Sequence, residues 1–261
     1  MNLKKNFTLL AVLCILVNTT LSGINVYAKN NTDKIPAKKN NYVNTTSNKR
    51  EVNKEEVFEK RSEDELSFFN NLSKEELDFL KKQYKSVTKE EKLIYSIELL
   101  KTTIGKYSRD AILGNNLTGK PIKVQFKNLS ELSQQHASFD ALGWKKSGKL
   151  NIYINEKHQD APPIALAALL SHEALHQDEL DSLNEETYAW TMEALVWNEL
   201  SDKYPNQANK PHPLVTRENT LKKLLQKGNY TDKYIRKSVF SNPGYKNLPT
   251  RSPGFEDQDN L

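Results

Sequence analysis

Seven consecutive apolar residues, from Ile164 to Leu170, follow directly after Pro162 and Pro163. Proline is tolerated in the first turn of a helix but not in its interior, so we expect a helix to begin at this pair. A helix that is apolar on nearly every side must be surrounded by other elements of the same domain. The sequence therefore predicts one packed domain built around this helix.

Three segments before the apolar run carry the start signal of a helix, a hydroxyl residue three positions before a glutamate. The pairs are Ser62 and Glu65, Ser73 and Glu76, and Thr88 and Glu91. In such a capping box the two side chains bond to each other's backbone N–H groups. Apolar residues spaced three and four apart follow each pair, so we expect three helices whose apolar faces belong to the core.

The hydrophobic period changes to two after Gly119. Residues 121–126 alternate apolar and polar side chains, and residues 140–144 and 150–155 flank a turn that contains Gly148. This pattern predicts a strand followed by a β-hairpin. Further helices are expected from about Asn184 and over residues 214–225. The predicted fold class is α+β and mainly helical, with a small antiparallel sheet packed on the helix that follows Pro163.

Residues 1–28 have the pattern of a secretory signal peptide. Lys4 and Lys5 precede an apolar stretch, and Val26, Tyr27 and Ala28 form a small-residue cleavage site. A membrane anchor is the alternative, but the apolar stretch is short for a span. We expect a secreted, extracellular protein with no stable membrane span after cleavage, and association with the cell wall is a further option.

The remaining chain divides into three parts. Residues 29–61 are rich in Asn, Lys and Thr and poor in large apolar side chains, which predicts a flexible linker; a propeptide is the alternative. Residues 62–118 form a helical N-terminal part, and residues 119–261 form the part with candidate chemistry and a tail rich in Pro and Gly. The formal charge of +5 is too small to predict nucleic-acid binding.

Two histidines four residues apart, His172 and His176, close the apolar segment, and Glu173 lies between them. Residues at this spacing share one face of a helix, so the two imidazoles can bind one Zn²⁺. Glu173 is rotated by about 100° and can accept a proton from metal-bound water. The alternative is a surface stripe at the helix end, but burying these groups without a metal would be costly.

A catalytic zinc needs a third protein ligand, and no third histidine follows at close range. A carboxylate from the next helix is therefore expected. Glu186 is favoured because the small Ala189 three positions later permits close helix packing, whereas Glu185 has Tyr188 there; Glu185 stays the alternative ligand. Glu193 shares the face of Glu186 and either orients a histidine or lies on the helix surface.

The motif of His172, Glu173 and His176, followed by a helix with Glu186 and Ala189, resembles the zincin metallopeptidases of the gluzincin branch over residues 120–200. The resemblance implies a zincin-like domain in which His172 and His176 bind zinc and Glu173 is the catalytic base. It also implies a strand along the cleft that pairs with an extended peptide, and the strand from Leu150 to Asn155 matches that position. The chain differs from the better-known branch at Trp190, where that branch has Asp, so no subfamily is assigned.

These features predict a secreted zinc-dependent metallopeptidase that hydrolyses peptide bonds by Glu-assisted attack of zinc-bound water. One alternative is an exported, non-catalytic binding or structural protein that retains a zincin fold. Another is a zinc hydrolase that acts on a cell-wall polymer. The reaction also needs a donor for the oxyanion, and four side chains are candidates: Tyr188, Tyr230, His212 and Arg217. We expect His136 and His158 on the surface.

Overall fold

The structure is a computed structural model that describes residues 68–114, 119–146, 149–176 and 181–252. The predicted signal peptide, the linker and the helix start at Ser62 lie outside these residues. No helix in the described ranges is long and apolar enough to cross a membrane.

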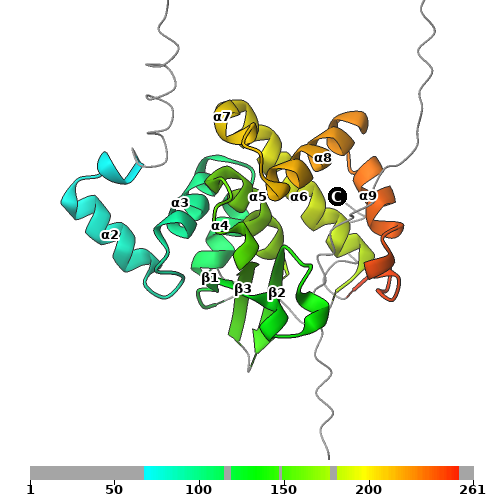
Figure 1. The fold of residues 1–261 in the computed structure, drawn as a ribbon, viewed down its shortest axis with the longest axis horizontal. Helices are drawn as coiled ribbons and strands as arrows, with labels where there is room; N and C mark the ends of the chain where they lie inside the picture. Colours follow the sequence, from blue (N-terminus) through cyan, green and yellow to red (C-terminus); the bar gives the residue numbers. More distant parts are fainter. Residues whose placement is uncertain (1–67, 115–118, 147–148, 177–180, 253–261) are drawn as a thin grey trace, which may run out of the picture.

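The described chain is mainly helical. Before the strands come α2 (Lys74–Tyr84), α3 (Glu91–Leu99) and α4 (Lys106–Leu113); after them come α5 (Pro163–Glu173), α6 (Leu183–Lys203), α7 (Pro205–Ala208), α8 (Pro213–Lys227) and α9 (Lys233–Phe240). In Figure 1, α2 lies at one end of the molecule and α8 and α9 at the other, with α5 and the sheet between them.

Helix α5 is the centre of the domain, as its sequence predicts. Pro163 occupies its first turn, and every residue from Pro163 to Glu173 is buried. Apolar side chains of α3, α5, α6 and the sheet form one continuous core. A second, smaller core lies between α6, α8 and α9 and includes Trp190 and Tyr245. Because α6 contributes to both cores, its position relative to α5 is fixed from two sides.

The sheet contains three strands, β1 (Lys123–Lys127), β2 (Ala141–Lys146) and β3 (Lys149–Asn155). The predicted hairpin is confirmed, because β2 pairs with β3 in antiparallel orientation. The prediction of an antiparallel sheet is wrong, because β1 pairs with β3 in parallel orientation. Alternating side chains identify a strand and its buried face but not its partner, so the sequence pattern left this pairing undetermined.

The strand order β1-β3-β2 makes β3 the central strand. Residues 151–154 pair with β1 on one side and with β2 on the other. The ladder groups of residues 151–154 therefore face other strands on both sides, and the described sheet leaves no open edge there for an added strand. Binding of a peptide substrate along Leu150 to Asn155 stays a prediction that this strand order does not favour. Within the described sheet, the strands with an open edge are β1 and β2.

The observed helix starts can be compared with the capping boxes that the sequence predicts. The capping box at α2 is confirmed: the backbone N–H of Ser73 donates to Glu76 over 2.8 Å, and that of Glu76 donates to the Ser73 hydroxyl over 3.2 Å. Helix α3 begins two residues later than its signal indicates, because Glu90 is its N-cap and the Thr88 hydroxyl accepts from the Glu90 N–H instead. Helices α4 and α9 were not predicted.

Candidate metal centre

The two histidines lie at the end of α5, although not both on the helix. Helix α5 ends at Glu173, and the chain continues in a turn in which the N–H of Leu175 donates to the carbonyl of His172 over 2.9 Å. His176 follows this turn instead of occupying the next helical position. The two imidazole rings still lie 5.1 Å apart between centroids, so the predicted pairing of the histidines is retained.

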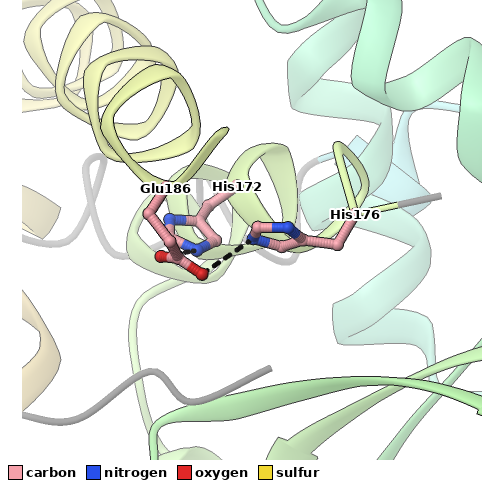
Figure 2. Close-up of side chains that lie close together, drawn as sticks. All are labelled: His172, His176 and Glu186. Carbon is pink, nitrogen blue, oxygen red and sulfur yellow. Dashed lines mark ion pairs between the residues drawn. The ribbon is translucent and has the colours of Figure 1, made fainter. Parts of the chain in front are cut away.

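The carboxylate of Glu186, in the first turn of α6, faces both imidazoles (Figure 2). Its Oε2 is 3.8 Å from Nε2 of His172, and its Oε1 is 3.6 Å from Nε2 of His176. These distances are too long for hydrogen bonds. They are close to the roughly 3.3–3.5 Å that separates two ligands of one tetrahedral zinc ion when each bond is about 2.0–2.2 Å.

Three atoms that face one another here are buried and make no hydrogen bond of ordinary length within the described residues, although Tyr245 lies near enough to Glu186 to lower its pKa. They are Nε2 of His176 and the two carboxylate oxygens of Glu186. Polar atoms buried in this way cost free energy unless something binds them. A cation held by His172, His176 and Glu186 would satisfy all three, so this donor set of two imidazoles and one carboxylate fits zinc.

The other nitrogen of each imidazole is held by a different carboxylate. Nδ1 of His172 is 3.1 Å from Oε2 of Glu193, and Nδ1 of His176 is 3.1 Å from Oε1 of Glu185. A carboxylate at Nδ1 requires the proton on that nitrogen, which leaves the Nε2 lone pair for a metal. The structure therefore separates the two candidate ligands: Glu186 faces both Nε2 atoms, and Glu185 lies at Nδ1 of His176. It also places Glu193 as a partner of His172.

Negative charge accumulates around His176. Burial lowers the pKa of His176, but Glu186 and Glu185 outweigh that effect and raise the pKa to about 10. Burial and the charge of Glu186 raise the pKa of Asp181 to about 7. Burial also raises the pKa of Glu186, although both histidines oppose the shift. Several buried carboxylates around one imidazole are an environment that a divalent cation would balance.

His176, Asp181 and Glu185 form another buried group whose ligand atoms lie within 4.8 Å of one another. This group offers a metal one imidazole nitrogen instead of two. Glu185 in this group already contacts Nδ1 of His176. Zinc prefers nitrogen ligands over carboxylates alone, so the group with His172 and Glu186 is the better zinc site.

Glu173 is fully buried at the end of α5, beside strand β2. A Cβ atom at Gly143 would lie 3.6 Å from Oε2 of Glu173 and 3.7 Å from Cβ of His176. The strand backbone thus passes directly next to the proposed base. Gly143 lies inside a strand that the sequence pattern predicts, and a glycine at such a position is a known signal of close backbone approach that was missed.

The four candidates for oxyanion stabilisation are either exposed or paired with other groups of the described chain. Tyr188 and Tyr230 are 40% and 57% exposed. His212 accepts a hydrogen bond from the N–H of Leu214 at the start of α8, and its Nε2 is 3.2 Å from Asp160. The guanidinium group of Arg217 pairs with Glu193 and Glu218.

The prediction that His136 and His158 lie on the surface is wrong. His158 is 1% exposed, and its Nε2 is 2.7 Å from Oδ1 of Asp140. His136 is 4% exposed and packs against the rings of Phe139 and Trp144. Asp140 lies 18 positions before His158, and Trp144 belongs to β2, so composition alone does not identify these partners.

Comparison of the chain with protein-family models, with curated proteins and with solved structures gives no match.

Proposed function

We propose that the chain is a secreted zinc-dependent metallopeptidase with a zincin-like catalytic arrangement. The observation that carries the proposal is the convergence of two histidine Nε2 atoms on the carboxylate of Glu186, in a buried position, with Glu173 on the same segment. A general-base carboxylate directly after the first histidine is the arrangement that hydrolysis by metal-activated water requires.

Each residue has a distinct role in this proposal. His172, His176 and Glu186 hold the zinc, which when bound lowers the pKa of its water and polarises the substrate carbonyl. Glu173 accepts the proton of the attacking water and delivers it to the leaving amine, as a general base and then a general acid. Glu193 and Glu185 keep the two imidazoles in the tautomer that presents Nε2.

The open edge of β2 is the proposed position of the peptide substrate. An extended peptide can add to an open strand edge through its backbone hydrogen bonds. Strand β2 has such an edge in the described sheet and passes Glu173 at Gly143. Since His172, Glu173 and Glu186 are fully buried, a peptide reaches them only when the surrounding segments move apart.

The first experiment is elemental analysis of purified residues 29–261, with His172→Ala as the matched variant. We expect one zinc per chain, lost in the variant, and a peptide library that is cleaved only by the zinc-loaded protein. Absence of zinc after reconstitution would overturn the metal site. Zinc without cleavage of any peptide would favour the non-catalytic binding protein, or a hydrolase of cell-wall polymers if those are cleaved.

Export is tested separately, because it depends only on residues 1–28. We expect the protein in the culture medium, with an N-terminus at Lys29. A cell-bound protein that retains Met1 would contradict this part of the proposal.

A further inference from the structure

Arg217, on α8, is a buried arginine whose side chain is 9% exposed. Its Nη2 donates to Oε2 of Glu193 over 2.9 Å, and its Nη1 contacts Oε1 of the same carboxylate. The guanidinium group therefore holds Glu193 with two parallel hydrogen bonds. Such a two-pronged pair fixes the orientation of a carboxylate as well as its position.

The other nitrogen contacts of Arg217 also go to carboxylates. Nη1 donates to Oε1 of Glu218 over 2.9 Å, and Nε lies 3.5 Å from Oδ2 of Asp140. The guanidinium group also lies over the ring of Trp190, 5.7 Å from its centroid. Because all three nitrogens face carboxylates, the side chain is held in one orientation and is not directed at a substrate carbonyl.

Glu193 connects Arg217 to the metal centre. The oxygen that accepts from Nη2 of Arg217, Oε2, is the same atom that lies 3.1 Å from Nδ1 of His172. Glu193 and His172 are both 0% exposed, so solvent does not compete for these contacts. The orientation of the His172 ring thus depends on a carboxylate whose own orientation depends on Arg217.

We propose that Arg217 is a positioning residue of the metal centre, which acts through Glu193 to keep the proton of His172 on Nδ1 and its Nε2 toward the metal. This inference rests on the proposed function, because Arg217 contacts Glu193, the partner of the proposed zinc ligand His172. Lysine would not replace Arg217, since an ammonium group cannot form the two parallel bonds.

The alternative is that Arg217 only neutralises buried carboxylates and so contributes to folding alone. The chain offers a matched control for this role, Arg109, whose side chain is 10% exposed and whose Nη2 lies 2.6 Å from Oε1 of Glu98. Both arginines form buried pairs with glutamates. The pair of Arg217 contacts a proposed metal ligand, whereas the described contacts of Glu98 go to Tyr84 and Arg109.

The test measures zinc affinity by competition with a chelator in Arg217→Met, Arg217→Lys, Glu193→Gln, the double variant Arg217→Met with Glu193→Gln, and Arg109→Met. Loss of a residue that orients a ligand typically weakens metal binding by about 10–100-fold. We expect a loss in this range for Arg217→Met and for Glu193→Gln, and a smaller loss for Arg217→Lys. The double variant should lose no more zinc affinity than whichever of Arg217→Met and Glu193→Gln binds zinc more weakly. Arg109→Met should keep the zinc affinity of the unmodified protein within about twofold.

A second measurement, the ¹⁵N chemical shifts of the His172 ring, reports the tautomer directly and needs no metal. In the metal-free protein we expect the proton on Nδ1, and a mixed tautomer in Arg217→Met. Unchanged affinity and tautomer in that variant, or losses that add in the double variant, would overturn the role of Arg217. If the unmodified protein binds no zinc, the proposed function fails, while the tautomer still shows whether Arg217 acts on His172. If Arg217→Met does not fold, Arg217→Lys provides both readouts.

Discussion

The hydroxyl group of Ser252 donates a hydrogen bond to Oε2 of Glu185 over 3.3 Å. The other oxygen of that carboxylate faces Nδ1 of His176, so the end of the described chain reaches the candidate metal centre through one intermediate residue. The neighbouring backbone reinforces this contact, because the carbonyls of Pro249 and Thr250 accept from the first N–H groups of α6 over 2.9 and 3.1 Å. The C-terminal segment therefore helps to place the helix that carries Glu185 and Glu186.

We predict that Ser252→Ala weakens zinc binding without preventing it. A single hydrogen bond of this kind contributes about 0.5–1.5 kcal/mol, which corresponds to a loss of roughly 2–10-fold in affinity. Chelator competition measures the change. Ser241→Ala is the control, because the Ser241 hydroxyl makes an exposed hydrogen bond to Ser238. An equal effect of the two substitutions would contradict a link from Ser252 to His176.

We predict that Glu186→Ala weakens zinc binding far more than Glu185→Ala. Glu186 faces both Nε2 atoms and would be lost as a ligand, whereas Glu185 meets His176 at Nδ1 and not at Nε2. Removing an orienting partner costs about 10–100-fold in affinity, and removing a ligand should cost more. Elemental analysis after dialysis separates the cases, with the exposed Glu199 of α6 changed to Gln as control. The reverse order would make Glu185 the third ligand.

We predict that Glu173→Gln keeps the fold and the zinc but lowers the rate of peptide hydrolysis by at least about 100-fold. General-base catalysis contributes about 10²–10⁴-fold, and an amide cannot accept the proton of the attacking water. Zinc content and the rate constant kcat are measured on the same preparation. A variant that retains its zinc and its full rate would remove Glu173 from the reaction.

We predict that Gly143→Val reduces hydrolysis while the protein still binds zinc. The Cβ atom fits at ordinary contact distance, 3.6 Å from Glu173, but the added methyl groups must press on Glu173 or project over the open edge of β2. Gly143→Ala is the matched control and should retain most activity. If Gly143→Val and Gly143→Ala are equally active, the substrate does not pass this part of β2.

Features that were predicted from the sequence depend mainly on local interactions. The capping box of Ser73 and Glu76 closes within one turn, the β2–β3 hairpin is set by its turn, and α5 is recognised by its continuous apolar surface. The two histidines and Glu173 were identified for the same reason, since their spacing within five residues carries the signal.

Features that were missed depend on partners distant in the sequence. The parallel pairing of β1 with β3 joins segments separated by more than 20 residues, and Arg217 meets Glu193 across 24 positions. The sequence makes Arg217 a candidate oxyanion donor because of its positive charge. Its partner Glu193 lies too far along the chain for a sequence pattern to identify the pair. The choice between Glu185 and Glu186 likewise required the packing of α6 on α5, which sets which carboxylate faces Nε2.

The buried contact between Asp140 and His158 contributes stability that we predict is lost in acid. Burial lowers the pKa of His158, so below about pH 6.5 the unfolded chain binds a proton that the folded chain resists. Burial alone would raise the pKa of Asp140, but His158, Arg217 and Lys157 outweigh it and lower the pKa. The stability that Asp140 contributes is therefore present above about pH 4 and lost as the pH falls through its folded pKa.

Both groups act in the same direction, so the part of the free energy of unfolding that this contact contributes should fall as the pH is lowered from 7 to 3. Asp140→Asn should cost about 1.5–3 kcal/mol at pH 7, because it removes a buried carboxylate that accepts a hydrogen bond from His158. It should lose less additional stability below pH 4 than the unmodified protein. Urea unfolding at several pH values measures both effects, with Asp202→Asn, whose side chain is 70% exposed, as the control. A stability of Asp140→Asn equal to that of the unmodified protein at pH 7 would show that this contact does not stabilise the fold.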